Sequence, residues 1–253
     1  MNARLNFSIA TTLTSVLLLG AMAARARASS FNAADDFSIT DNPNGAWQYG
    51  WSESLGSTFN LLDGGSLASP TVEHWQAPDG QATGFNSFMM HNLLDEVNLF
   101  FETISLEPNQ LALHPGENGA YSVLRWVAPE TGNYSLSGVF TGQDMDDRTT
   151  SDVHILYNGV SLFSNFVNGS GAASAQSFTT TQLFQAGDVI DFAVGYGANQ
   201  DWSYDSTGLD ATIETVSTEP VPEPSVISGL ALLALVASGK FVARGKSIAS
   251  EKS

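Results

Sequence analysis

The chain runs Tyr121-Ser122-Val123-Leu124-Arg125-Trp126-Val127, turns through Ala128-Pro129-Glu130-Thr131-Gly132, and alternates again from Tyr134 to Phe140. Successive side chains of a β-strand point to opposite faces of the sheet, so apolar residues at alternate positions gather on one face. Proline and glycine between the two runs mark a turn. This stretch therefore predicts two β-strands joined by a short turn.

The same pattern continues toward the C-terminus. Val153 to Tyr157 is followed by Asn158-Gly159 and then by Val160 to Phe163. Asn-Gly between two such runs is a strong signal for a hairpin with a type I′ turn. Long amphipathic helical patterns are missing from the sequence. We therefore expect an all-β fold, an antiparallel, jelly-roll-like β-sandwich over residues 29–218. Further strands are expected at 177–184, 188–194 and 209–216.

Composition limits the chemistry that the chain can perform. Its 253 residues include no cysteine, which excludes disulfides, thiolate catalysis and zinc–thiolate sites. Residues 29–219 hold two basic side chains, Arg125 and Arg148, against 24 acidic ones, which gives a net charge near −22. Such a surface repels nucleic acid and anionic membrane alike. We therefore expect no nucleic-acid partner.

The N-terminus has the three parts of a signal peptide. Arg4 gives a positive start, Phe7 to Met22 is apolar, and Ala26-Arg27-Ala28 has small residues where signal peptidase cuts. We expect residues 1–28 to be removed on export, with Ala26 and Ala28 at the cleavage site. A cut after Ala23 is an alternative.

The C-terminal residues 219–253 contain an apolar run, Ser225 to Gly239, that is followed by basic residues. Fifteen residues form a helix of about 22 Å, which is shorter than the roughly 30 Å hydrocarbon core of a bilayer. Lys240 must therefore snorkel so that the helix extends to residue 243. The sequence predicts a transmembrane segment over 225–243 with its basic end in the cytoplasm.

Directly before this segment stand Val221-Pro222-Glu223-Pro224. The Pro-Glu-Pro motif, the apolar span and the basic tail together resemble the PEP-CTERM sorting signal of Gram-negative bacteria. The resemblance implies processing by an exosortase and by signal peptidase, and a place in the cell envelope or the exopolysaccharide matrix. A permanent single-span membrane anchor is the alternative.

Four segments of residues 31–216 resemble an ectodomain of PEP-CTERM and related secreted proteins. Its β-sandwich is similar to jelly-roll carbohydrate-binding modules, and the resemblance implies no particular reaction. The segments are Leu111 to Gly116, Arg125 to Pro129, Asp152 to His154 and Asp205 to Ala211.

Two groups of aromatic residues are candidates for glycan binding, because aromatic rings bury the flat C–H faces of sugars. Trp47, Tyr49 and Trp51 alternate, which places them on one strand face, and filling the sandwich core is the alternative role. Trp202 and Tyr204 lie in the polar segment 199–205, which we expect to be a loop at one end of the sandwich.

Two sets of carboxylates are candidates for calcium, which prefers six to eight oxygen ligands. The alternatives are solvated surface charge and, for Asp210, an ion pair with Arg125. The first set is Asp144, Asp146 and Asp147, and the second is Asp201, Asp205 and Asp210.

Catalytic motifs are weak. The histidines lack the spacing of a His-Glu-x-x-His metal site, and no Gly-x-Ser-x-Gly elbow is present. We therefore assign no catalytic residue. The four histidines are His74, His91, His114 and His154.

The sequence favours an exported, noncatalytic envelope or matrix protein that associates with exopolysaccharide through a glycan-binding β-sandwich. A structural surface protein without a specific ligand is one alternative, which buried rings at Trp47, Trp51 and Trp202 would favour. A polysaccharide hydrolase or lyase is the other, and it would need a long cleft with two facing carboxylates or a cluster of His, Tyr or Arg.

Overall fold

The computed structural model describes residues 29–77, 86–108 and 110–216. The predicted signal peptide, the Pro222-Glu223-Pro224 motif and the segment 225–243 lie outside these residues. Within the described part, no helix is long and apolar enough to span a bilayer.

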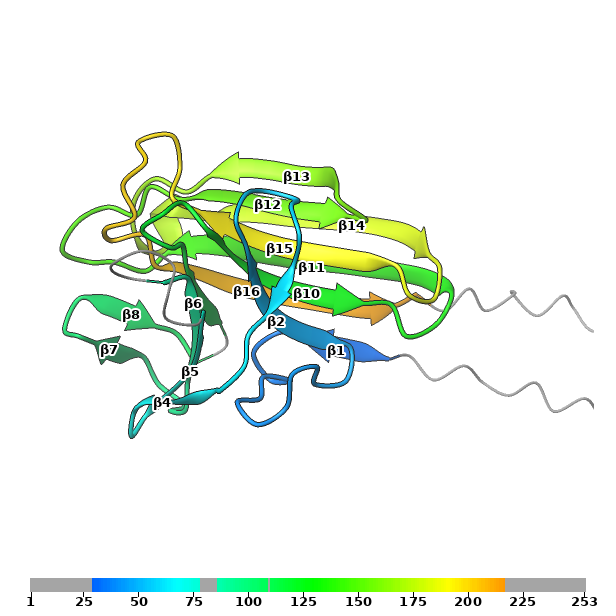
Figure 1. Cartoon of the computed structure of the whole chain (residues 1–253), viewed down its shortest axis with the longest axis horizontal. Helices are drawn as coiled ribbons and strands as arrows, with labels where there is room; N and C mark the ends of the chain where they lie inside the picture. Colours follow the sequence, from blue (N-terminus) through cyan, green and yellow to red (C-terminus); the bar gives the residue numbers. More distant parts are fainter. Residues whose placement is uncertain (1–28, 78–85, 109, 217–253) are drawn as a thin grey trace, which may run out of the picture.

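Two large antiparallel sheets make up most of the described chain (Figure 1). Sheet A has the spatial order β14 (Gln176–Phe184), β11 (Gly132–Gly142), β16 (Thr207–Thr215), β9 (Leu111–His114), β6 (Phe88–Asn92), β5 (Val72–Gln76) and β4 (Ser66–Ser69), and β1 (Ser30–Asn32) also pairs with β16. Sheet B has the order β13 (Val160–Phe166), β12 (Asp152–Tyr157), β15 (Val189–Gly195), β10 (Tyr121–Val127), β2 (Trp47–Ser52) and β3 (Asn60–Leu61). The expected all-β, antiparallel fold is confirmed.

Each strand predicted from residue 121 onward is present, with ends that differ by a few residues. The Asn158-Gly159 hairpin is confirmed in detail, because its two residues have φ angles of 48° and 80°, and a type I′ turn needs positive φ at both central positions. From β9 to β16 the chain crosses between the sheets at most connections, as in a jelly-roll-like sandwich.

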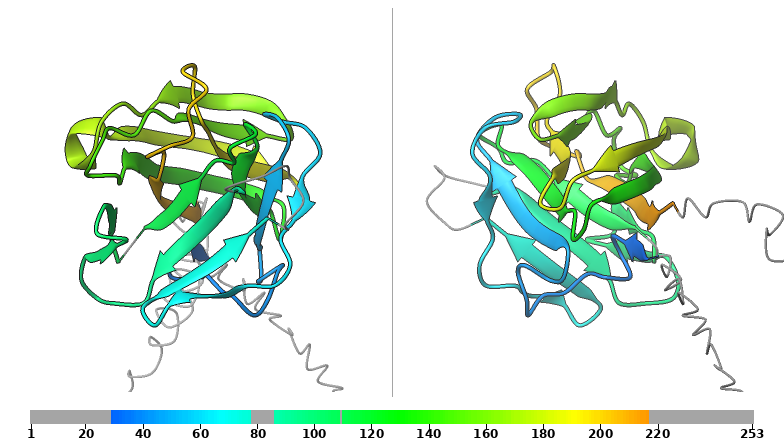
Figure 2. Two further views of the ribbon diagram at one scale, coloured as in Figure 1. Left: turned by 60° about the vertical axis from the view of Figure 1, so that its left-hand side comes forward. Right: turned by 90° about the vertical axis from the view of Figure 1, so that its right-hand side faces the viewer.

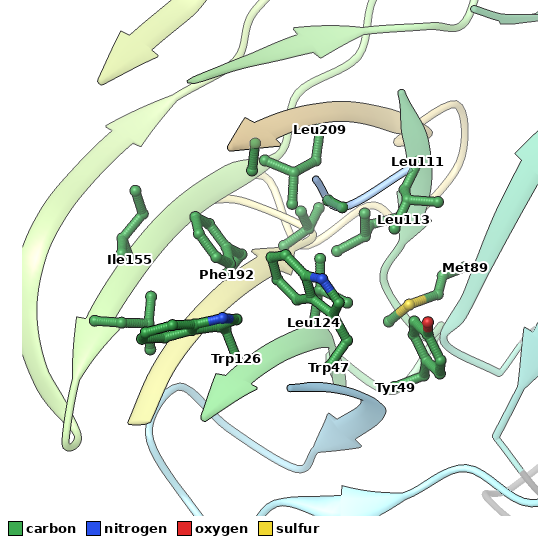
Figure 3. Packing of buried hydrophobic residues seen from close by; sticks show 14 of the residues in the cluster. Trp47, Tyr49, Met89, Leu111, Leu113, Leu124, Trp126, Ile155, Phe192 and Leu209 are labelled. Carbon is green, nitrogen blue, oxygen red and sulfur yellow. The ribbon is translucent and has the colours of Figure 1, made fainter. Parts of the chain in front are cut away.

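The inner faces of the two sheets form one core (Figure 3). Trp126 and Leu124 of β10 are fully buried, and the Trp126 ring meets Tyr134 of β11 edge-to-face with centroids 5.1 Å apart. Phe184 of β14 packs against the same indole. Burying each such ring contributes about 1.5–3 kcal/mol, so the core joins sheet to sheet through aromatic contacts.

Arg125 lies on the opposite face of β10 from Trp126. The register places it beside Asp191 of β15, and its Nε and Nη2 donate to the two carboxylate oxygens at 2.6 and 2.9 Å. Phe59 covers the guanidinium at 3.9 Å. The alternative pairing of Arg125 with Asp210 is therefore wrong, because Asp210 belongs to the other sheet.

The ends of the described chain meet at one end of the sandwich, where Thr215 hydrogen-bonds Ser29. The connection between β15 and β16, residues 196–206, lies at the opposite end, and it is the gold loop that projects beyond the strands in each view (Figures 1 and 2). We call this opposite end the loop end.

A short hairpin, β7 (Asn98–Phe100) and β8 (Ile104–Leu106), folds over the outer face of sheet A near the loop end. Phe100, Ile104 and Leu106 pack with Val72, Met90 and Ala112 in a second, smaller apolar cluster. The backbone of β8 also hydrogen-bonds the segment after β11, because Ser105 N donates to Gln143 O and Met145 N donates to Thr103 O. The hairpin thus forms a wall beside the end of β11.

Candidate functional site

The loop 196–206 is held at both ends by carboxylates against the start of β12. Asp152 Oδ1 accepts a hydrogen bond from Gly197 N at 2.8 Å, and Asp205 Oδ1 accepts from Thr150 N at 2.6 Å. Gly197 has a φ of +70°, and a Cβ there would overlap the Thr150 carbonyl oxygen. Glycine is therefore needed where the loop leaves β15.

Asp152 also joins side chains of two strands. Its Oδ2 accepts from Tyr121 Oη at 2.6 Å and lies 2.8 Å from His154 Nε2. Burial opposes ionisation of this carboxyl, but the bonds from His154, Tyr121 and Gly197 outweigh burial and lower its pKa. Burial and the bond to Asp152 raise the pKa of Tyr121. This group contains the His and Tyr side chains that a lyase would need, although Asp152 uses both oxygens to hold the fold.

Trp202 and Tyr204 stand in the middle of the loop, as the sequence predicts. Trp202 is half-buried and meets His114 edge-to-face at 6.0 Å, whereas Tyr204 is 43% exposed and has a φ of +63°. Burial lowers the pKa of His114 to about 4, against the effect of its bond to the Pro115 carbonyl. A neutral imidazole therefore supports the indole at pH 7, and the Tyr204 ring faces solvent.

The alternating rings of β2 do not form a binding surface. Trp47, Tyr49 and Trp51 are 1%, 0% and 7% exposed and belong to the core. Trp47 Nε1 donates a hydrogen bond to the Asp36 carboxylate, and Tyr49 Oη donates one to the Asp36 backbone carbonyl. Burial is the largest cause of the rise in the pKa of Tyr49 to about 12. These three residues fill the sandwich, which was the alternative role, and the glycan-platform hypothesis for them is wrong.

A cavity of about 260 Å³ lies at the loop end, between the β7–β8 hairpin and the end of β11. We call it the polar cavity, because most of its lining residues carry a hydroxyl, amide or carboxyl group, although apolar atoms supply most of the exposed wall. Its lining residues are Ser105, Glu107, Gln110, Thr141, Gly142, Gln143, Met145, Ser170 and Gly171.

Two glutamine side chains meet in the polar cavity. Gln110 Oε1 accepts from Thr141 Oγ1 at 3.3 Å and from Gln143 Nε2 at 3.4 Å. A Cβ at Gly208 would overlap the Gln110 amide oxygen, so glycine in β16 makes room for these groups. Gln143 is 3% exposed, and its Oε1 is buried without a hydrogen-bond partner. Buried polar atoms are nearly always paired, so this oxygen of a lining residue is an exception to that rule.

The two predicted calcium sets are not assembled. Asp144 and Asp205, one from each set, are buried close enough that their charges interact. Burial raises the pKa of both carboxyls, that of Asp205 to about 7. Asp144 Oδ2 accepts from Ser206 N at 2.8 Å. In the described part of the chain, no three His, Asp or Glu side chains form a group that could hold a metal ion.

The other members of the calcium sets lie apart. Asp146, Asp147 and Asp201 are exposed, and Asp210 is half-buried on β16. The nearby charge that raises the pKa of Asp210, after burial, is that of Asp35, which belongs to neither set. These carboxylates are therefore spread over the surface, as the solvated-charge alternative expects.

Sequence reasoning missed the polar cavity. Glu107 and Gln110 flank the connection between β8 and β9, and Gln143 follows β11, so 33 positions of sequence separate the two glutamines that meet. Neither the connection between β8 and β9 nor the segment after β11 contains a known motif or a regular spacing of apolar residues. The available signal was Gly208, a glycine inside a strand pattern, which can mark the close approach of another group.

No protein-family model matches this sequence, and no curated protein matches it. Among solved structures, the chain is similar to a family 35 carbohydrate-binding module from Clostridium thermocellum, with 14% identity over 58% of this chain and 89% of the module and a TM-score of 0.26. It is also similar to a Podospora anserina GH26-CBM35 β-(1,4)-mannanase, with 13% identity over 78% of this chain and 30% of the enzyme and a TM-score of 0.29. Pika GITRL is 16% identical over 38% of this chain and 79% of that chain, with a TM-score of 0.25. At such scores these likenesses carry no argument about function.

Proposed function

We propose that this chain is an exported, noncatalytic, glycan-binding β-sandwich of the cell envelope or exopolysaccharide matrix, sorted through its Pro222-Glu223-Pro224 segment. The observation that carries the proposal is the polar cavity, whose lining includes Gln143, a residue with a buried Oε1 that has no partner. A sugar hydroxyl can donate to an amide oxygen and accept from a neighbouring amide in return, so the glutamine amides of the lining suit such a ligand.

The remaining wall suits the same ligand. Ser105, Thr141 and Ser170 offer hydroxyls, and the exposed Met145 offers an apolar surface for a C–H face. A volume of about 260 Å³ lies just below the roughly 300–1,000 Å³ of pockets for drug-sized ligands, so the cavity fits one sugar ring. Tyr204 and Trp202, which lie at the same end of the sandwich, would contact the next sugar ring of the same polysaccharide.

A noncatalytic role is supported by the charge of the cavity wall. Glycoside hydrolysis uses two carboxyl groups that flank the scissile bond, whereas Glu107 is the one carboxylate among the lining residues. Such a wall can hold a sugar through hydrogen bonds without offering both an acid and a base. Release of reducing ends from a bound polysaccharide would contradict this part of the proposal.

A binding screen tests the proposal. The full chain is applied to envelope and exopolysaccharide glycans, and the hits are titrated by calorimetry. Because Gln143→Ala removes a buried amide that the ligand would contact, we expect its affinity to fall about tenfold or more. Glu53→Gln in the loop after β2 is the control and should bind like the native chain. Absence of binding to every glycan would overturn the proposal.

Sorting is tested separately. Replacing Glu223 by Ala, with Pro222 and Pro224 kept, should leave the C-terminal segment on the protein, and the mass of the envelope-bound chain reports this. An unchanged mature mass in the E223A variant would refute processing at this signal while leaving the glycan hypothesis intact.

One observation favours a second candidate, a structural surface protein without a specific ligand. Trp47 and Trp51, two of the three rings whose burial would favour it, lie in the core. This candidate predicts that substitutions in the polar cavity change no binding and that the protein contributes to the matrix through its abundance alone.

A further inference from the structure

We infer that the polar cavity prefers an amino sugar with a free, protonated amine, and that Glu107 binds the ammonium group. This inference rests on the proposed function and names the class of glycan that the same site would take. Glu107 is the one charged side chain among the lining residues, so the charge of the cavity wall is negative.

Glu107 is a half-buried carboxylate without a counter-ion in the described part of the chain. Ser105 Oγ donates a hydrogen bond to its Oε1 at 3.5 Å. The ectodomain has two arginines, of which Arg125 is bound to Asp191 and Arg148 is exposed in the loop after β11. A carboxylate partly removed from water gains most from a cationic donor, and a ligand can bring that donor.

The rest of the protein strengthens this preference. Residues 29–219 carry a net charge near −22, so the field of the molecule concentrates cations and repels anions. A uronic acid would bring its carboxylate against Glu107 without an arginine or lysine in the cavity wall to hold it. The cavity should therefore reject acidic sugars, in which the like charges repel.

The neutral groups explain why the ligand would be a sugar amine and not a simple cation. The amides of Gln110 and Gln143 and the Thr141 hydroxyl lie within one hydrogen-bonded group. Thr141 and Gln143 lie at the end of β11, across the cavity lining from the connection between β8 and β9 that carries Glu107. A ligand that satisfies both walls needs an ammonium at one position and hydroxyls at another. Glucosamine-type sugars carry both on one ring.

Calorimetry with short, defined oligosaccharides tests the inference on the full chain. We expect a disaccharide of glucosamine to bind about tenfold or more tightly than its N-acetylated form, because hydrogen bonds to charged groups are the stronger ones. A disaccharide of glucuronic acid should bind weakest. Glu107→Gln should abolish the preference for the amine while keeping affinity for the N-acetylated sugar.

Glu53→Gln is the matched control, because it changes the net charge equally at a site outside the cavity. If both variants lose the amine preference to the same extent, the attraction is general and the assignment to Glu107 is overturned. If N-acetylated and free-amine sugars bind equally, and Gln143→Ala weakens both, the inference fails and the proposed function stands. If no sugar binds, both fail.

Discussion

Two aromatic groups of this protein look alike in sequence and have opposite environments. Trp47, Tyr49 and Trp51 of β2 are buried in the core, whereas Trp202 is half-buried and Tyr204 is 43% exposed in the loop 196–206. The difference comes from position in the fold. Strand β2 lies between β10 and β3 inside sheet B, and its aromatic face points at sheet A, while the loop passes beyond the ends of both sheets.

The comparison shows what each group can do. A buried ring contributes through packing and excluded water, so its removal is felt as lost stability. A loop ring contributes little to packing and is available to a ligand. Substitutions in the core group should therefore lower stability, whereas substitutions in the loop group should lower glycan affinity.

The largest expected effect is on the core group. Trp47→Ala should lower the free energy of unfolding by about 3–5 kcal/mol, because it leaves a cavity beneath Phe192 and Asp36 without its indole donor. Denaturant titration followed by circular dichroism measures this change. Trp202→Ala serves as the comparison and should cost much less. Equal losses in the two variants would contradict the difference between the groups.

The next effect tests whether the loop is held as firmly as a strand. Gly197→Ala should lower the free energy of unfolding by about 1–3 kcal/mol, since alanine is strained at a φ of +70° and its Cβ overlaps Thr150 O. Gly187→Ala is the control, because Gly187 has a φ of +88° but nothing within 4 Å of the added Cβ. The excess of the first loss over the second measures the contact at Thr150. Equal losses would mean that the loop moves away at no cost.

A third prediction concerns pH and the loop's second anchor. The pKa of Asp205 rises from 3.8 to about 7 on folding, first because of burial, so the folded state holds a proton that the unfolded state has lost. The free energy of unfolding should therefore fall as pH rises from about 4 to about 7, and this contribution should level off above that range. Asp205→Asn lacks this titration, and its stability curve should diverge from that of the native chain by about 1 kcal/mol or more. Parallel curves would refute the shift.

The smallest effect on stability is expected at Tyr204. Tyr204→Ala should change the free energy of unfolding by less than about 0.5 kcal/mol, because the side chain faces solvent. Under the proposed function, it should weaken glycan binding by about 0.5–1.5 kcal/mol, and Tyr204→Phe should restore the affinity. Stability measured by denaturation and affinity measured by calorimetry must both be determined for each variant. A large loss of stability with unchanged affinity would place Tyr204 with the core group.

Local patterns predicted the all-β fold class and the strands from residue 121 onward, whereas most of the shorter strands before that residue were not predicted. The alternation from residue 121 to 140 located β10 and β11, and Asn158-Gly159 located a hairpin, because these features depend on neighbouring residues. The partner of Arg125 was predicted wrongly, because Asp191 and Asp210 both lie in strand patterns and only the register of β10 with β15 selects between them. The PEP-CTERM sorting signal stays a prediction.

The sequence by itself determined the strand periods, the turn types and the strongly acidic, cysteine-free character of this chain, since each follows from neighbouring residues or from composition. Only the tertiary structure decided which aromatic face lies inside, which of many carboxylates meet, and that Glu107, Gln110 and Gln143 share one cavity. These facts depend on how two sheets stack and on which loops reach the same end. The alternation of side chains along a strand determines which residues share a face of the sheet, but it does not determine whether that face packs in the core or meets solvent.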